Sequence, residues 1–574
     1  MNKIKKLRKY FKNFDLGGYI VPKNDEFFGE YVDEKKDRLK YISQFSGSAG
    51  LALILKNKNY LFVDGRYTLQ AKKEVNKNFK IVEIHKYKPY KILAKIRKRI
   101  KIGFDPKLFS EAFLHANVKT KNINLVPINK NLIDKMQPKK TIGKVKKFFT
   151  LPVKYVGVDY QKKLNQLSKI IKKNKINKLL ITAPENLAWL LNIRGSDSKY
   201  SPLPNCHAVF DQTKKITLIV NQNKISNKFK NYFKNSLNYI EPKDIIKYFE
   251  SLNSKEIFLI DRYTCSAFYK WLIKKKFRYY EKSDPIYILK AKKNNVEIKN
   301  SIKSHIADGV ALTKFIYWIK NNINKIKITE ISAEKKLESL RKKNKKYKFP
   351  SFNTISGAGP NAAIVHYRAS KKSNRLIKKN DIYLCDSGGQ YHYGTTDVTR
   401  TLCFSSHTMK IKNIFTKVLK GHIGVVTHNL KNNTTGSELD QIARAPLKKI
   451  GLDYSHGTGH GVGYFLNVHE GPQSISKFGS QKFEEGMIVS NEPGYYETNK
   501  FGIRIENLLY AKKYKNKLKF ENLTLAPIEN DLINFKLLTD EEKKYLNNYH
   551  KKVYKTLKPF LNNNEKNWLR SVTL

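Results

Sequence analysis

Three histidines lie close together in the glycine-rich stretch HGTGHGVGYFLNVHEGP at 456–472. His456 and His460 stand at the i, i+4 spacing of a helical zinc pair. The residues between them, Gly-Thr-Gly, disfavour a helix, because each interior glycine costs about 1 kcal/mol. The sequence therefore predicts an extended strand or loop here. Either one of these histidines binds metal with ligands from elsewhere in the chain, or none does.

Four carboxylates lie within or at the end of apolar, strand-like runs. Asp386 and Asp397 belong to DIYLCDSGGQYHYGTTDVTRT, where two such runs flank a Gly-rich turn, so the two acids are expected on neighbouring strands. Glu492 ends MIVSNE, and the Pro-Gly after it marks a turn. Glu506 lies in GIRIENLLY, where strand alternation places it on the same face as Arg504.

These acids and one histidine together form a metal-ligand set. Buried carboxylates are costly unless they are paired or bind a metal, and neighbouring carboxylates repel one another. Oxygen-rich ligands with a single imidazole favour Mn²⁺ ahead of Zn²⁺ or Co²⁺. Four carboxylates can neutralise two divalent ions, and metals about 3.5–4 Å apart can share a bridging hydroxide. Taken singly, each acid could be a solvated turn residue; the order Asp, Asp, His, Glu, Glu in one domain favours the metal site.

The elements that must position these residues divide into α/β and α+β regions. The strand-like runs GYIVP, LALIL, YLFVD and KIVEI are followed by a second run with a helix at 161–173 and the strands KLLIT, HAVFD, ITLIV and IFLID. The similar rhythm suggests two related α/β domains. From residue 294 a long amphipathic helix begins, and helices near 329–343, 411–429 and 436–450 alternate with strands.

Domain boundaries follow from these shifts in composition. We expect α/β domains at 1–135 and 157–293, separated by a basic, proline-bearing linker at 136–156. An α+β domain at 294–512 carries the candidate ligands, and a C-terminal extension at 513–574 contains a helix that the capping box TDEE opens.

Composition excludes several classes of protein. With 574 residues and 40% hydrophobic content, the chain is a multidomain globular protein. Its four scattered cysteines indicate reduced thiols and an intracellular setting, and we expect neither a secretory signal nor a membrane span. The net charge of +64 is spread over almost every segment, so specific nucleic-acid binding is not expected.

The motifs DSGGQYHYGTTDVTRT, HGTGHGVG, NEPGYY and GIRIEN, in this order, resemble those of the pita-bread metallopeptidases of family M24. Within that family the chain is similar to the long, three-domain cytosolic Xaa-Pro aminopeptidases (aminopeptidase P). The similarity extends to SGSAG, DGRYTLQA, ENLAWLLNIRGSD and LAPIENDLI. It implies two creatinase-N-like α/β domains followed by a pita-bread α+β catalytic domain, with the extension at 513–574 packed on that domain and forming a homodimer. It also implies a cytoplasmic location.

The resemblance also implies roles for the metal ligands. Asp386 would bind one metal ion, Asp397 and Glu506 would bridge both ions, and His460 and Glu492 would complete the second. Glu492 would in addition carry a proton toward the leaving nitrogen, first as a base and then as an acid.

Substrate-side groups are implied in the same way. His469 would hydrogen-bond the substrate carbonyl or the developing oxyanion, with His456 and His366 near the substrate. Arg504 would orient these groups, and Arg66 in DGRY would reach the substrate. Without the resemblance, His366 is an ordinary loop histidine and Arg66 a structural ion-pair partner. The remaining assigned histidines are expected at the surface: His85, His115, His392, His407, His422, His428 and His550.

The implied function is a dinuclear-metal aminopeptidase that hydrolyses the N-terminal Xaa-Pro bond of peptides through a metal-bridging hydroxide. A prolidase-like dipeptidase of the same fold is the main alternative, and a basic non-catalytic binding module a second. Methionine aminopeptidase leaves the two N-terminal domains unexplained, and creatinase relatives lack the metal ligands.

Overall fold

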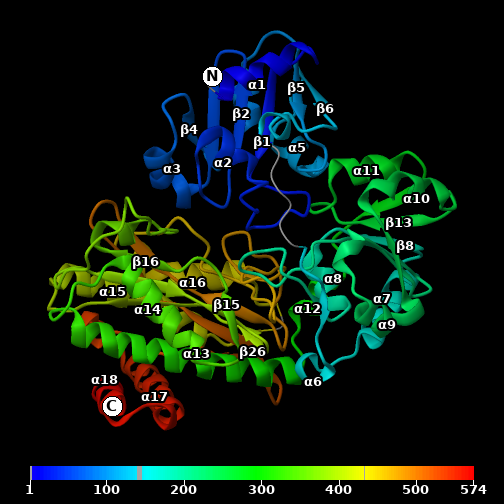
Figure 1. Ribbon diagram of the computed structural model, residues 1–574. Helices are drawn as coiled ribbons and strands as arrows, with labels where there is room; N and C mark the ends of the chain where they lie inside the picture. The colour runs from blue at the N-terminus through cyan, green and yellow to red at the C-terminus, as the bar shows by residue number, and fades with distance from the viewer. Residues whose placement is uncertain (1–2, 139–144, 432) are drawn as a thin grey trace. The chain divides into compact units, whose positions relative to one another are not determined.

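The computed structural model describes residues 3–138, 145–431 and 433–574, in two compact units (Figure 1). The first unit comprises Met1–Pro152 with Val158–Tyr287, and the second comprises Val153–Gly157 with Ile288–Leu574. Part of the predicted linker, residues 139–144, lies outside the described residues. The rest of it contains β7 (Phe149–Thr150) and α6 (Val153–Val156). Among the described residues, no helix combines the length and apolar character needed to cross a membrane.

The first α/β domain is built on a six-stranded sheet in the order β4-β3-β2-β1-β5-β6. Its central strands are the predicted apolar runs, and burial of all five residues of GYIVP explains why they read as continuous rather than alternating. The elements are α1 (Lys3–Lys12), β1 (Gly18–Pro22), α2 (Arg38–Ser43), β2 (Leu51–Leu55), β3 (Asn59–Val63), α3 (Thr68–Glu74), β4 (Lys80–Glu83), α4 (Pro89–Leu93), β5 (Ile100–Phe104), α5 (Glu111–Asn117) and β6 (Ile123–Pro127).

The second α/β domain repeats this topology. Its sheet has the order β12-β11-β10-β8-β13-β14, with the same sequence of parallel and antiparallel pairings as the first sheet. The predicted relation between the two domains is therefore confirmed. The elements are α7 (Tyr160–Lys173), β8 (Lys178–Ile181), α8 (Pro184–Leu190), β9 (Ile193–Arg194), β10 (His207–Asp211), β11 (Ile216–Ile219), α9 (Asn227–Phe233), β12 (Leu237–Ile240), α10 (Ile245–Ser251), β13 (Ile257–Ile260), α11 (Ala267–Lys274), β14 (Arg278–Glu281) and α12 (Ile286–Ala291).

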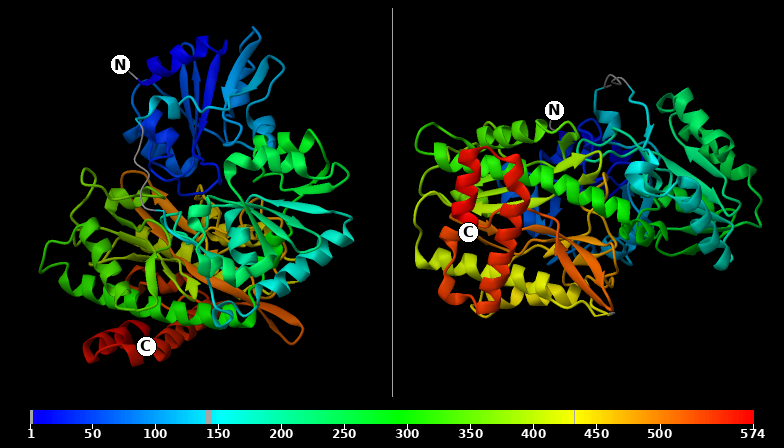
Figure 2. Two further views of the ribbon diagram at one scale, coloured as in Figure 1. Left: turned by 45° about the vertical axis from the view of Figure 1, so that its right-hand side comes forward. Right: turned by 90° about the horizontal axis from the view of Figure 1, so that it is seen from below.

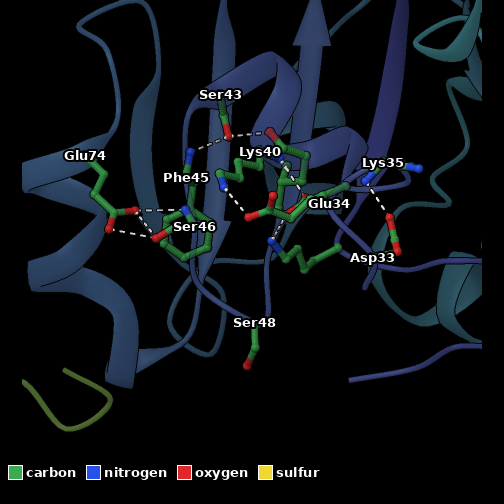
Figure 3. A network of polar contacts seen from close by, with 12 residues as sticks. Asp33, Glu34, Lys35, Lys40, Ser43, Phe45, Ser46, Ser48 and Glu74 are labelled. Atoms are coloured by element: carbon green, nitrogen blue, oxygen red, sulfur yellow. Dashed lines mark hydrogen bonds and ion pairs between the residues drawn. The ribbon is translucent and has the colours of Figure 1, made fainter. Parts of the chain in front are cut away.

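The turn-rich SQFSGSAG connector of the first domain is fixed by side-chain hydrogen bonds (Figure 3). The backbone N–H and the hydroxyl of Ser46 both donate to the carboxylate of Glu74, the last residue of α3, at 2.8 Å. Ser43 Oγ accepts from the N–H of Phe45 at 3.2 Å. Farther along, Ser48 Oγ lies 2.7 Å from the hydroxyl of Tyr67. The connector is thus tied to the DGRY turn that carries Arg66.

The second unit surrounds short antiparallel sheets with long helices. Three-stranded sheets have the orders β16-β17-β20, β15-β18-β19 and β23-β26-β27, and two-stranded pairs are β24-β25 and β21-β22. The elements are α13 (Asn295–Asn322), α14 (Glu330–Lys342), β15 (Tyr347–Pro350), β16 (Ile355–Ala358), η6 (Gly359–Ala363), β17 (Tyr383–Ser387), β18 (Gly389–Tyr391), β19 (Gly394–Thr395), β20 (Val398–Leu402), α15 (Met409–Thr427), α16 (Gly436–Lys448), β21 (Gly459–His460), β22 (Ser474–Ile475), β23 (Ile488–Asn491), β24 (Gly494–Glu497), β25 (Phe501–Arg504), β26 (Asn507–Tyr514) and β27 (Lys517–Asn522).

The C-terminal residues continue the second unit. Helices α17 (Asp540–Leu557) and α18 (Asn563–Thr573) lie against α13 (Figure 2). The predicted capping box opens α17, since Thr539 accepts from the N–H of Glu542 and the Glu542 carboxylate accepts from the N–H of Thr539. Strand β26 runs across the boundary placed at 512/513, because it pairs with β27 as a continuous hairpin.

Two of the histidines expected at the surface are buried instead. His422 in α15 is fully buried, with Nδ1 3.1 Å from the carbonyl oxygen of Asn491. His550 in α17 is buried, and its Nε2 accepts from the N–H of Ile528 at 3.1 Å. Burial lowers the pKa of His422 to about 3 and that of His550 to about 4. The sequence alone misplaced them because each lies on the packed face of its helix.

A buried ion pair joins α13 to α14. The guanidinium of Arg341 binds both carboxylate oxygens of Asp308, at 2.9 and 3.0 Å, and also donates to Ser387 Oγ at 3.0 Å. The hydroxyl of Tyr391 donates to the same carboxylate at 2.8 Å. Both charges are almost fully buried, so each depends on the other.

Replacing Arg341 tests this dependence. Arg341→Met should destabilise the second unit by about 3–5 kcal/mol, because it leaves the Asp308 carboxylate buried and uncompensated. Thermal and urea unfolding of the purified protein measure the loss. The double variant Asp308→Leu/Arg341→Met should recover part of the stability, and a single variant as stable as the wild type would contradict the pairing.

Candidate metal centre

Neighbouring strands present the two aspartates. Strands β17 and β20 pair antiparallel, and Asp386 on β17 lies opposite Thr399 on β20. Asp397 precedes β20 by one residue. The predicted neighbouring-strand arrangement is therefore present, although β18 and β19 lie between the two strands along the chain.

His460 lies on strand β21, in agreement with the extended conformation predicted for the HGTGHGVG stretch. Its N–H donates to Ser490 Oγ at 2.9 Å, which joins β21 to the strand that precedes Glu492. A Cβ atom on Gly459 would lie 1.9 Å from the Ser490 carbonyl oxygen, so only glycine allows this approach. The imidazole Nε2 lies 3.5 Å from Asp397 Oδ2 and 3.4 Å from Glu492 Oε1.

Each of the two glutamates follows a β-strand. Glu492 comes directly after β23, and its N–H donates to the Thr458 carbonyl at 2.8 Å. Glu506 lies between β25 and β26, and its carboxylate accepts from Thr399 Oγ1 at 2.7 Å. Arg504 Nε donates to the same hydroxyl at 3.2 Å. The side chains of Arg504 and Glu506 therefore lie on the same face and share Thr399 Oγ1 as a hydrogen-bond partner, as strand alternation predicts.

The ligand atoms of Asp397, His460 and Glu506 all lie within 4.8 Å of one another. Glu492 adjoins this group through its contact with His460. Asp386 is oriented by Arg504, whose Nη2 donates to Oδ2 at 2.6 Å, while Oδ1 is buried with no hydrogen-bond partner among the described residues. The structure thus gathers all five predicted ligands in one region of the second unit.

Burial and mutual repulsion of the carboxylates in this cluster favour the binding of cations. Burial raises the pKa of Asp397 well above its usual value, and Asp386 and Glu492 raise it further. Burial likewise raises the pKa of Glu506, with added repulsion from Asp397 and Glu492. The pKa of Glu492 is raised by burial and by Asp386, against the opposing effect of His460 and Arg504. Several buried carboxylates around one imidazole, with an unsatisfied carboxylate oxygen, are a donor set that divalent ions fit.

Two of the predicted substrate-side histidines lie beside the cluster. The ring of His469 packs edge-on against that of His460, with centroids 4.3 Å apart and planes at 82°. His456 Nε2 lies 2.9 Å from the Tyr496 hydroxyl, and its backbone carbonyl accepts from Arg444 of α16 at 2.6 Å. His456 is therefore anchored from both ends.

His366 lies in the turn after η6. The carbonyl of the preceding residue, Val365, accepts from Arg504 Nη2 at 3.5 Å. This contact places the turn next to the Arg504 guanidinium that also holds Asp386.

Tyr496 was not predicted, yet it connects two predicted residues. Its hydroxyl accepts from Arg504 Nη1 at 2.5 Å and lies beside His456, so His456, Tyr496, Arg504 and Asp386 form one hydrogen-bonded chain. Burial raises the pKa of Tyr496 to about 12, so it stays a neutral phenol. The one sequence signal was its place in NEPGYY, four residues after Glu492.

Arg66 lies in the first unit, on the 3-10 turn η1 (Gly65–Tyr67). Its guanidinium binds the carboxylate of Asp64 at 3.0 and 2.7 Å, which is the structural pairing expected without the family resemblance. Its reach to substrate stays a prediction.

Known proteins match this chain along its whole length. The model of metallopeptidase family M24 matches residues 300–513, and that of its C-terminal region matches 516–574. Creatinase/Prolidase N-terminal domain models match 3–136 and 136–297. Xaa-Pro aminopeptidase 1 of Dictyostelium discoideum is 36% identical, covering 99% of this chain and 95% of that protein. The chain belongs to the Xaa-Pro aminopeptidases of metallopeptidase family M24.

Other members extend this result. A probable Xaa-Pro aminopeptidase P of Laccaria bicolor is 36% identical over 99% of this chain and 92% of its own. The crystal structure of a Caenorhabditis elegans X-prolyl aminopeptidase, described as a cytosolic enzyme with a di-nuclear active site, superposes with a TM-score of 0.93. It is 29% identical and covers 100% of this chain and 99% of its own. The predicted fold of two creatinase-N-like domains before an M24 catalytic domain is confirmed.

The raised carboxyl pKa values predict how metal removal changes stability. In the folded, metal-free protein these groups hold protons that the unfolded chain releases near pH 4, so their stabilising contribution is complete below about pH 4. It is lost as the pH rises through the raised values of Asp397, Glu492 and Glu506. Chelator-treated protein should therefore lose stability as the pH rises above the usual carboxyl range of about 4 and through the raised pKa values of these groups, and added Mn²⁺ should reduce this loss.

Thermal unfolding with and without Mn²⁺ measures the effect, and Glu506→Gln is the matched control because it removes one titrating carboxyl. The pH dependence of the metal-free variant should be weaker than that of the wild type. Equal pH dependence in both proteins would contradict the assignment of raised pKa values to this cluster.

Proposed function

We propose that the chain is a dinuclear-metal aminopeptidase that removes the N-terminal residue from peptides with proline in the second position. The observation that carries this proposal is the convergence of Asp397, His460 and Glu506 within 4.8 Å, with Glu492 and Asp386 beside them, in a member of the Xaa-Pro aminopeptidases.

The five clustered residues would hold two divalent ions, for which Mn²⁺ suits the oxygen-rich donors, with Zn²⁺ and Co²⁺ as alternatives. Asp386 would serve one ion, Asp397 and Glu506 both, and His460 and Glu492 the other. Bound ions of this kind polarise a carbonyl and lower the pKa of water.

The remaining chemistry falls to side chains around the ligands. Glu492 would accept a proton from the attacking water and deliver it to the proline nitrogen. His469, beside His460, would donate to the developing oxyanion, where charge appears only in the transition state. His366 and His456 would line the substrate, and Arg504 holds Asp386 and the Tyr496 hydroxyl in place for this.

The length of the chain favours an aminopeptidase over a prolidase. The prolidase of Pyrococcus horikoshii matches with a TM-score of 0.52 at 27% identity, and its whole length covers 64% of this chain. The Caenorhabditis elegans enzyme covers all of it. We therefore infer peptides rather than dipeptides as the substrates.

Peptide hydrolysis tests the function directly. Purified protein with Mn²⁺ should release arginine from Arg-Pro-Pro and not from Arg-Ala-Ala, because the tertiary amide before proline has no N–H and needs a dedicated site. Asp397→Ala should lower the rate by at least about 100-fold, since it removes a ligand rather than a supporting group. Chromatographic quantification of free arginine measures both.

Asp531→Ala is the control for removal of an acid, because Asp531 is largely exposed in a different cluster with Cys403 and Glu529. Its activity should match the wild type. Absence of arginine release by the metal-loaded wild type would refute the proposal, and cleavage confined to dipeptides such as Arg-Pro would identify a prolidase.

We further propose a cytoplasmic homodimer that binds neither nucleic acid nor membranes specifically. Dimerisation would use the C-terminal extension at 513–574, which continues the last domain. Light scattering on the purified chain should give about twice the mass of 66.8 kDa at micromolar concentration. A measured mass equal to that of a single chain at micromolar concentration would reject the dimer while leaving the catalytic proposal intact.

A further inference from the structure

We propose that Glu470 is a positioning residue, clamped by two buried lysines, that fixes His469 and His460 relative to each other. Its role for catalysis rests on the proposed function, in which His469 stabilises the oxyanion and His460 binds metal. Glu470 follows His469 in VHEGP, but it belongs to none of the ligand or substrate-side groups described above.

The clamp consists of one carboxylate between two ammonium groups. Glu470 Oε2 lies 3.0 Å from Lys290 Nζ, and Oε1 lies 3.1 Å from Lys293 Nζ. The exposed fractions of the three side chains are 2%, 1% and 1%. Burial alone would raise the pKa of Glu470, but Lys290 and Lys293 together lower it, so the carboxylate stays ionised. Such a buried cluster is costly to assemble, and it holds only in one geometry.

The backbone of Glu470 connects the two site histidines. Its N–H donates to the Gly461 carbonyl at 2.8 Å, and Gly461 directly follows His460. A Cβ atom on Gly461 would lie 2.0 Å from the Glu470 carbonyl oxygen, so the two segments touch at backbone distance. Glu470 is therefore joined by a peptide bond to His469 and by a hydrogen bond to the residue after His460. The imidazole rings of His469 and His460 have centroids 4.3 Å apart.

The lysine segment is itself anchored to the strand that leads to Glu492. Lys293 N–H donates to the Gly486 carbonyl at 3.0 Å, and Lys292 forms an antiparallel bridge with Met487. Strand β23 begins at the next residue and ends just before Glu492. The segment 290–293 thus contacts both Glu470, in the loop after His469, and the residues just before β23, the strand that leads to Glu492.

These contacts give Glu470 a supporting role rather than a chemical one. Both of its carboxylate oxygens face lysines, and the side chain is buried, so it does not serve as a base for substrate. Groups that do not touch the metal or substrate but orient the residues that do typically contribute about 10–100-fold to metal affinity or activity. We expect this range for Glu470.

The primary test is Glu470→Gln. With Arg-Pro-Pro, kcat should fall by about 10–100-fold while KM changes little and two metal ions per chain remain bound. Glu470→Asp, which keeps the charge, should recover part of kcat. Glu484→Gln is the matched control: it makes the same change in the neighbouring Lys292–Glu484 pair, which is half-exposed, and should leave kcat unchanged.

A double-mutant cycle separates positioning from general structural damage. If Glu470 acts through His469, adding Glu470→Gln to His469→Ala should lower kcat by no more than about 2-fold beyond His469→Ala alone. An undiminished effect of Glu470→Gln in that background would overturn the proposal, as would a folded Glu470→Gln enzyme with wild-type kcat.

Hydrogen exchange of the segment 459–473 provides a measurement that does not depend on activity. Exchange there should accelerate in Glu470→Gln and not in Glu484→Gln, and unchanged exchange would overturn the clamp. A wild type that fails to hydrolyse Arg-Pro-Pro would refute the proposed function, and exchange would still decide the clamp. If Glu470→Gln does not fold, Lys293→Met, which leaves one lysine for one carboxylate, should show the same changes in exchange and kcat; a wild-type result would overturn the proposal.

Discussion

Mutual repulsion among buried carboxylates is the constraint on which the catalytic domain depends. Burial disfavours the charged forms of Asp397, Glu492 and Glu506, and repulsion from neighbouring carboxylates, including that of Asp386, disfavours them further. Either protons or divalent cations can relieve this repulsion. The surrounding structure supplies partial compensation through Arg504, whose guanidinium reaches Asp386 directly and Glu506 by way of Thr399.

Short, rigid backbone segments hold these charges together. The ligands come from four places in the chain, and each lies on a strand or within two residues of one. Cross-links such as His460 N–H to Ser490 Oγ and Glu492 N–H to the Thr458 carbonyl join strands that are distant in sequence. Buried charges also hold the backbone at Glu470, where Lys290 and Lys293 pair with a carboxylate that is not itself a candidate metal ligand.

Much of this arrangement could be predicted from the sequence. Strand runs such as GYIVP and KLLIT, the helix at 161–173 and the TDEE capping box depend on local pattern, and each was found within a few residues. The glycines around His460 correctly excluded a helical zinc pair. Local pattern failed for His422 and His550, because burial of a helix face depends on what packs against it. It also missed Tyr496, whose importance lies in partners eight and forty residues away in the sequence.

By itself, the sequence determined the identity and order of the candidate ligands, the repeated α/β domains and the family. These features depend on residue types and on patterns among residues that are close together in the chain. Only the tertiary structure decided which atoms meet. It placed Asp397, His460 and Glu506 within 4.8 Å, paired Arg504 with Asp386, and buried Glu470 between Lys290 and Lys293. The physical reason is that a charge–charge contact depends on distance through space, and residues 177 positions apart, such as Lys293 and Glu470, carry no local signal of their proximity.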